Sequence, residues 1–174
     1  NSTQAQTPLQ LEQIGYLLED ALLYSKQYLI PATDGAVYQA SSAWMNSAKR
    51  KKDWQISVGL HGNTFKVPNS DRSFIINNSD FKFLKLQGTA TSAEVPTALG
   101  NDDTFVLVGD LGGQEVRLKT PKGVNQEFIT YPYLDFSFAL PSGSEIIGRF
   151  SNKTDLKRGD YQVYGFGVKH NLSQ

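Results

Sequence analysis

The feature that most constrains this chain is an alternation, with a period of two, between bulky apolar residues and small or polar ones. Between residues 161 and 172, Tyr164, Phe166 and Val168 fall on one face of an extended strand, and Gly165 and Gly167 fall on the other. Such a strand has two faces that meet different surroundings. It belongs either to a water-soluble sandwich or to a barrel wall with lipid outside and water inside.

The same period recurs earlier in the chain. Residues 54–67 alternate, and so do residues 134–140, which a turn at 141–143 connects to a returning strand at 145–150. Residues 105–108 and 115–118 flank a glycine turn and predict a small hairpin. Residues 73–86 form an irregular strand, and residues 87–103 have the composition of a loop. The pattern predicts about seven strands arranged as hairpins.

An amphipathic helix is predicted before the strands. Thr7 is a suitable N-cap and Pro8 a suitable first helical residue. The residues that recur at three- and four-residue steps would form its packed face, until Pro31 ends the pattern after about twenty residues. These residues are Leu11, Ile14, Leu18, Ala21, Leu22 and Leu29. The helix would pack on a sheet or act as a plug or lid.

Composition excludes several classes of protein. The chain has 17 basic and 17 acidic residues, so no net charge favours nucleic acid as a partner. No apolar run approaches the roughly 18 residues of a membrane-spanning helix, but strands of a membrane barrel expose only every second residue to lipid. Cysteine is absent. The chain starts without methionine or an apolar leader, as expected after removal of a signal peptide.

Motifs for catalysis are lacking. His61 and His170 lie inside strand patterns, and no nucleophile elbow or phosphate-binding loop occurs. The Gly165-Phe166-Gly167 segment lacks the third glycine of a dinucleotide fingerprint and opens no helix. We therefore expect a non-enzymatic protein with no catalytic residue, no metal site and no cofactor.

Four segments, taken in order, resemble those of a known family. They are residues 42–49 (SAWMNSAK), 65–74 (FKVPNSDRSF), 140–146 (LPSGSEI, followed by Arg149-Phe150) and 164–170 (YGFGVKH). Over residues 10–174 the chain resembles an uncharacterised family of Bacteroidota proteins, which are thought to be outer-membrane barrels and are distantly similar to the long-chain fatty-acid transporter family.

The resemblance implies a mainly β fold: an antiparallel meander of hairpins, forming an outer-membrane barrel or part of one, with one N-terminal amphipathic helix. Residues 1–53 would be the helix and a small-residue hatch, and residues 54–174 the antiparallel β region. Closed bacterial barrels have an even number of strands, from eight upward. The open edges would therefore pair with a missing C-terminal part or with other envelope protein chains.

The expected function is that of an outer-membrane channel or transporter for hydrophobic small molecules, or of an accessory subunit of an envelope complex in a Gram-negative bacterium. The expected lumen-facing residues are Gly165, Gly167, Lys169 and Asn171. The residues expected to face lipid or a core are Trp54, Ile56, Val58, Leu60, Tyr164, Phe166 and Val168. The alternative is a soluble, secreted or periplasmic β-sandwich that binds a ligand or partner, in which the same apolar face forms the core. An enzyme with dispersed catalytic residues ranks last.

Overall fold

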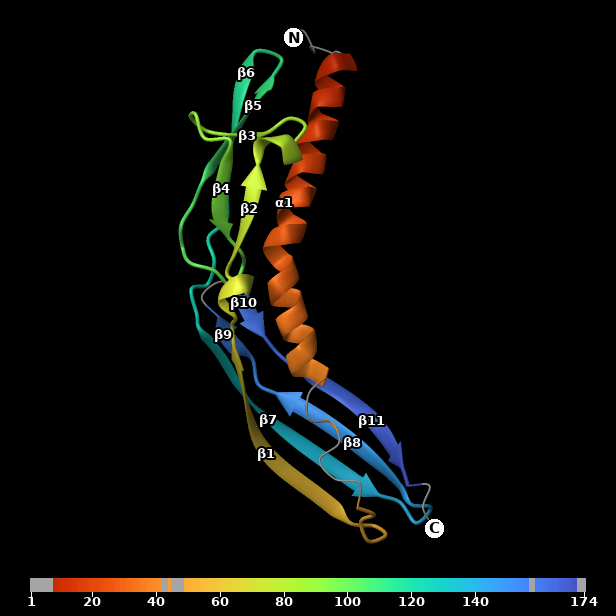
Figure 1. Cartoon of the computed structure of the whole chain (residues 1–174). Coiled ribbons are helices and arrows are strands. Elements are labelled where there is room, and N and C mark those ends of the chain that lie inside the picture. The colour runs from red at the N-terminus through yellow and green to blue at the C-terminus, as the bar shows by residue number, and fades with distance from the viewer. Residues whose placement is uncertain (1–7, 42–43, 45–48, 157–158, 172–174) are drawn as a thin grey trace, which may run out of the picture. The chain divides into compact units, whose positions relative to one another are not determined.

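The computed structural model describes residues 8–41, 44, 49–156 and 159–171. These residues form the helix α1 (Pro8–Ser41), eleven strands and two short 3-10 helices, and every strand pairing is antiparallel. The predicted mainly β fold with one N-terminal helix is confirmed (Figure 1). The chain divides into two compact units. Unit 1 comprises residues 1–34 and 67–127, and unit 2 comprises residues 35–66 and 128–174.

Unit 1 packs the first part of α1 on two small sheets. β2 (Ser73–Asn77) pairs with β4 (Ser92–Pro96), and β3 (Lys85–Leu86), β5 (Val106–Leu111) and β6 (Gln114–Lys119) form the second sheet. The 3-10 helices η1 (Asn69–Asp71) and η2 (Asn78–Asp80) flank β2. The predicted hairpin is β5–β6, and Gly112 and Gly113 at its turn have φ of +61° and +87°, which glycine adopts without steric cost.

A buried carboxylate fixes α1 to unit 1. Asp20 is 2% exposed, and its side chain accepts hydrogen bonds from the backbone amides of Lys82, Phe83 and Leu84 at 2.8, 2.7 and 2.8 Å. Next to it, Tyr24 joins the apolar core. Backbone donors removed from water need an acceptor, so Asp20 satisfies three of them at once.

The predicted packed face of α1 is wrong for its four leucines, whereas its other two residues, Ile14 and Ala21, are half-buried. Leu11, Leu18, Leu22 and Leu29 are 63, 59, 70 and 48% exposed. The helix instead turns the side that carries Asp20 and Tyr24 to the core, because the chain around residues 82–84 requires a hydrogen-bond acceptor there.

The predicted end of the helix at Pro31 is also wrong. Proline lacks the amide that would bond to the preceding turn, yet α1 continues to Ser41. The Thr33 hydroxyl donates to the carbonyl oxygens of Leu29 and Ile30 at 3.3 and 2.8 Å. Further on, Gln39 is buried in unit 2, and its backbone carbonyl accepts a 3.0 Å hydrogen bond from the Tyr131 hydroxyl. Tertiary contacts beyond the proline thus outweigh the local break.

Unit 2 is built on a four-stranded sheet of order β1-β7-β8-β11. Its strands lie side by side in Figure 1: β1 (Ile56–Lys66), β7 (Phe128–Ala139), β8 (Ser144–Ser151) and β11 (Tyr164–His170). β9 (Thr154–Leu156) and β10 (Gly159–Tyr161) form a separate hairpin. Neighbours in the sheet follow the order of the chain, with most of unit 1 inserted between β1 and β7 and the β9–β10 hairpin between β8 and β11.

Two expectations about the strands need correction. The segment 87–103 contains β4 rather than loop alone, because Ser92–Pro96 pairs with β2 along its whole length. Residues 151–160 (SNKTDLKRGD), whose polar composition also predicts a loop, contribute to the β9–β10 hairpin. The compact units also group the chain differently from the division at residues 53 and 54, since each unit takes part of α1 and part of the β region.

Candidate functional site

The sheet of unit 2 exposes an apolar face made of three cross-strand rows. Strand register aligns four positions in each row across β1, β7, β8 and β11. The rows are Ile56, Phe138, Ile146 and Val168; Val58, Phe136, Gly148 and Phe166; and Leu60, Leu134, Phe150 and Tyr164. Tyr164 and Phe166 are each 79% exposed, and Leu60 is 75% exposed. A contiguous patch of this kind marks a surface that meets a partner or a membrane.

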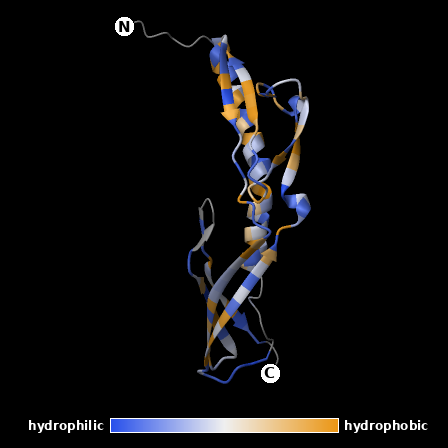
Figure 2. Cartoon of the chain, turned by 90° about the vertical axis from the view of Figure 1, so that its left-hand side faces the viewer, coloured by the Kyte–Doolittle hydropathy of each residue, from blue (hydrophilic) through white to orange (hydrophobic). Residues whose placement is uncertain are grey.

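Charge is almost absent from this face. Within the described residues of the four strands, the only Asp, Glu, Lys or Arg on the apolar face is Lys66, the last residue of β1. Trp54, which precedes β1, extends the face and packs on Phe138 with ring centroids 5.8 Å apart. The alternating colours along these strands in Figure 2 reflect the segregation of apolar and polar residues between the two faces.

The opposite face of the same sheet carries the charges, and much of it is buried. Glu145, 5% exposed, pairs with Lys51 at 2.5 Å and with Lys169 at 3.0 Å. Lys51 also donates to the hydroxyl of Ser137, which is 3% exposed. Buried charges need such partners, because each one loses its hydration. The pairing ties the segment before β1 to strands β7, β8 and β11.

A second cluster on the charged face surrounds Arg149, which is 4% exposed. Its guanidinium lies between two rings, 4.7 Å from the centroid of Trp44 and 4.3 Å from that of Tyr133. It also donates to the carbonyl oxygen of Ala40 at the end of α1, at 3.5 Å. Cation–π contacts gain strength when the cation is desolvated. Arg149 therefore joins α1 and Trp44 to the sheet.

A third pair lies on the same face. Nε2 of His61 is 2.5 Å from Oδ1 of Asp135, and the imidazole stacks on Tyr133 with centroids 5.2 Å apart. Every charged group of the three clusters thus points to one side of the sheet.

The residues predicted for the two faces separate as the alternation requires. Gly165, Gly167 and Lys169 lie on the charged face, where a Cβ at Gly165 would be 2.8 Å from the Trp44 ring and one at Gly167 would be 4.0 Å from it. Asn171 follows β11, and its amide donates to the carbonyl oxygen of Gly143. The residues predicted to face lipid or a core all belong to the apolar face. Whether lipid or water meets these faces stays a prediction.

Sequence reasoning singled out none of the charged residues of β7 and β8 as site residues. Asp135, Glu145 and Arg149 alternate with the apolar positions of their strands, so the rule applied to β11 would have found them. Lys51 belongs to a run of four basic residues, 49–52, which is typical of a solvated turn. No local signal indicates its long-range partner Glu145.

Unit 2 also has a shallow, mostly apolar depression of about 300 Å³ that is open to the surface. It lies between the end of α1 and the start of β11, and its lining residues are Ala36, Val37, Ala40, Gln162, Val163 and Tyr164.

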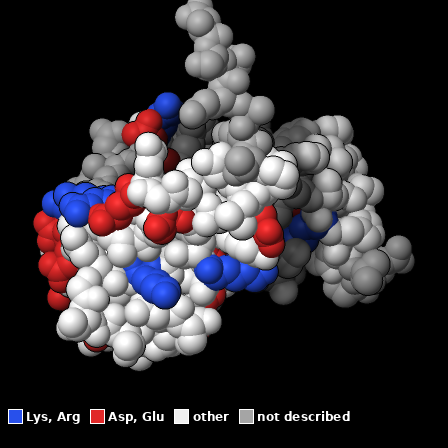
Figure 3. All heavy atoms as spheres, turned by 90° about the horizontal axis from the view of Figure 1, so that it is seen from above, with Lys and Arg blue, Asp and Glu red and all other residues white. Residues whose placement is uncertain are grey.

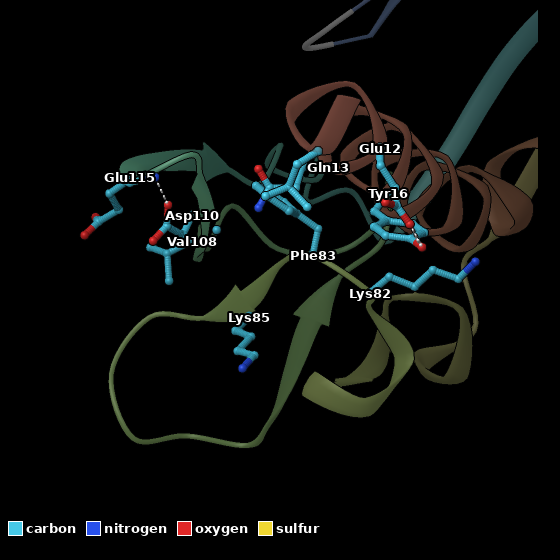
Figure 4. Close-up of a pocket in the computed structure, with 12 residues that line it drawn as sticks. Glu12, Gln13, Tyr16, Lys82, Phe83, Lys85, Val108, Asp110 and Glu115 are labelled. Carbon is cyan, nitrogen blue, oxygen red and sulfur yellow. Dashed lines mark hydrogen bonds between the residues drawn. The ribbon is translucent and has the colours of Figure 1, made fainter. Parts of the chain in front are cut away.

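Unit 1 has an open groove of about 730 Å³ between α1 and strands β3, β5 and β6. Figure 4 shows the residues that line the groove. On the face of the protein drawn in Figure 3, acidic and basic side chains are interspersed. The Tyr16 hydroxyl donates to Glu12, which raises the pKa of Tyr16. Lys82 donates to Glu19 outside the groove, which raises the pKa of Lys82. Tyr16 and Lys82 of the wall therefore both have acidic hydrogen-bond partners.

Metal-ligating clusters and membrane-spanning helices are both absent from the described residues. These residues contain no group of three or more His, Cys, Asp or Glu side chains that could hold a metal ion. Within the same residues, no helix is long and apolar enough to cross a membrane.

Neither a curated protein nor a solved structure matches this chain. The chain does match, over residues 1–174, a family described as a family of unknown function, DUF6588. This protein therefore belongs to the DUF6588 family.

Proposed function

We propose that the sheet of unit 2 is part of the wall of an outer-membrane β-barrel, with its apolar face against lipid and its charged face toward a water-filled interior. The observation that carries this proposal is the segregation of charge between the two faces. In a soluble protein the covered face of a sheet is usually apolar and the exposed face polar. In unit 2 the exposed face is apolar and the covered face carries the charges, as in barrels with a polar lumen.

The height of the uncharged face fits a bilayer. On β7 it runs from Phe128 to Phe138. On the neighbouring segment it runs from Trp54, which precedes β1, to Thr64 of β1. Ten residue steps at about 3.3 Å each span about 33 Å. At a strand tilt of about 40° this becomes about 25 Å, which is the height of the apolar band of outer-membrane barrels.

The contents of the charged face support the role of a plugged channel or transporter. The end of α1, Trp44 and Lys51 all contact this face through the Arg149 and Glu145 clusters. In a barrel they would obstruct the interior. A shallow, mostly apolar depression lies beside the end of α1, and we propose hydrophobic small molecules as cargo. The protein would act without catalysis, alone or as an accessory subunit of an envelope complex in a Gram-negative bacterium.

Strand edges in lipid must be paired. Within the described residues, β1 pairs only with β7, and β11 only with β8. The proposal therefore requires further strands beside β1 and β11, supplied by the same polypeptide or by other envelope chains.

Single-cysteine labelling tests the proposal, because the chain has no cysteine of its own. Val58→Cys places a fluorophore on the apolar face, Ser57→Cys places one on the charged face, and Ser142→Cys marks an exposed turn. In the full protein in vesicles, a lipid-attached quencher should quench the label at residue 58 and spare the labels at 57 and 142. If a water-soluble quencher reaches residues 58 and 142 equally, the membrane assignment fails.

A charge scan gives a second measurement. Phe166→Arg should destabilise the inserted protein by about 2–4 kcal/mol if residue 166 lies near the bilayer midplane. The alternative function, a soluble β-sandwich that binds a ligand or partner, would bury the same face in a protein core. It predicts a protein that stays monodisperse in buffer without detergent, and that result would replace the proposal.

A further inference from the structure

An exposed heptad stripe runs along α1 on the side opposite its packed face. It consists of Leu11, Gly15, Leu18, Leu22, Ser25 and Leu29, at steps of four and three residues. All six are exposed, and the four leucines are between 48 and 70% exposed. An apolar repeat every 3.5 residues is the pattern by which two helices pack along their length. The core of unit 1 leaves this stripe uncovered.

The large and small residues of the stripe are ordered so that two copies of it are complementary when they run antiparallel. We propose that α1 pairs with α1 of a second copy of this chain, antiparallel, around a two-fold axis between residues 23 and 24. Leu22 then faces Ser25 of the second copy, and Leu18 faces Leu29. Gly15 faces Ala32, which continues the heptad spacing. Leu22 thus packs against a small residue, and Leu18 and Leu29 pack against each other. Each copy uses the same surface, as a two-fold interface requires.

Charge along one flank of the stripe favours the same orientation. Glu12 and Glu19 lie on this flank near the start of α1, and Lys26 lies on it one heptad after Glu19. In an antiparallel pair, the flanks of the two helices run past each other in opposite directions, which brings Glu19 close to Lys26 of the second copy. Glu19 is free to take this partner, because its present pair with Lys82 is 57 and 60% exposed and contributes little.

A parallel pair fits less well. It would place Gly15 beside Gly15 and Ser25 beside Ser25, which leaves gaps in two layers of the contact and loses their packing. It would also separate the acidic part of the flank from Lys26 of the other helix. The stripe therefore specifies orientation as well as association. This pairing uses only unit 1 residues and does not depend on the proposed function of unit 2.

Cysteine cross-linking of the full chain distinguishes the arrangements. In the antiparallel pair, the two copies of residue 22 lie about 4.5 Å apart along the axis, whereas the two copies of residue 11 lie about 37 Å apart. Leu22→Cys should therefore form a dimer with a short bis-maleimide, and Leu11→Cys should not. A dimer at both positions would mean a parallel pair, and a dimer at neither would mean no pair. Either result overturns the proposal.

A charge substitution checks the contribution of the stripe. Leu22→Lys removes one leucine per copy from the contact and should weaken self-association about a hundredfold. The matched control is Leu9→Lys, which adds the same charge at a leucine of similar exposure outside the stripe, 64% against 70%. Equal effects of the two substitutions would show that the stripe is not the interface.

Discussion

Replacing Asp20 by alanine should lower the free energy of unfolding of unit 1 by about 3–5 kcal/mol. The substitution removes the carboxylate that accepts hydrogen bonds from the amides of Lys82, Phe83 and Leu84 at 2.7–2.8 Å. Each buried donor left without a partner costs about 1–3 kcal/mol. Leu84 is completely buried, whereas Lys82 is exposed. The unpaired amide of Lys82 should therefore cost an amount at the low end of this range.

Amide hydrogen exchange measures this effect at the residues concerned. In the wild-type protein the amides of residues 82–84 should be protected, and Asp20→Ala should reduce their protection by at least about a hundredfold, since 1.4 kcal/mol corresponds to a factor of ten. The control is Glu19→Ala, which removes the same charge from the neighbouring residue. Glu19 makes only an exposed pair with Lys82, so its loss should change stability by about 1 kcal/mol or less.

The comparison can refute the reasoning directly. If Asp20→Ala and Glu19→Ala lower the free energy of unfolding by amounts that agree within about 1 kcal/mol, then Asp20 does not hold α1 through these amides. The rejection of the leucine face as the packed face of α1 would lose its physical cause as well.

Three further predictions concern other buried groups. Burial raises the pKa of Tyr24 to about 12. The phenolate of Tyr24 is disfavoured only in the folded state, so the raised pKa contributes about 2–3 kcal/mol to the stability of the protein below pH 10. This contribution should be lost between about pH 10 and 12, and urea unfolding of Tyr24→Phe should lack the loss. Gly165→Ala should force the Trp44 ring to move and lower the melting temperature, whereas Gly167→Ala should change it little, because the added carbons would lie 2.8 and 4.0 Å from that ring. Glu145→Gln should destabilise unit 2 by about 2–3 kcal/mol, because it leaves two lysines beside a position whose side chain is 7% exposed. Salt should screen this loss of stability little, and a loss that vanishes at high salt would contradict the prediction.

Local pattern was sufficient for the hairpins and for the faces of their strands. The glycines at residues 112 and 113 indicated the β5–β6 turn, because the common two-residue hairpin turns have positive φ at one or both central positions, and glycine adopts positive φ without steric cost. Alternation assigned Tyr164 and Gly165 to opposite faces of β11, and the structure places them so. These features depend on residues close together in sequence, whose geometry the backbone itself imposes.

Contacts between distant residues decided the rest. The pairing of β1 with β7, across an insertion of 61 residues from Val67 to Glu127, leaves no mark in either strand. The sequence shows α1 as a helix with a leucine stripe, but only the demand of three backbone amides for the Asp20 carboxylate turns that stripe outward. Likewise, Lys51 becomes part of a buried cluster only because the chain brings it to Glu145. The sequence by itself thus determined the elements and their two-faced character, through local backbone geometry and periodicity. Tertiary structure decided which face is covered, because that depends on which polar groups of distant segments must be satisfied together.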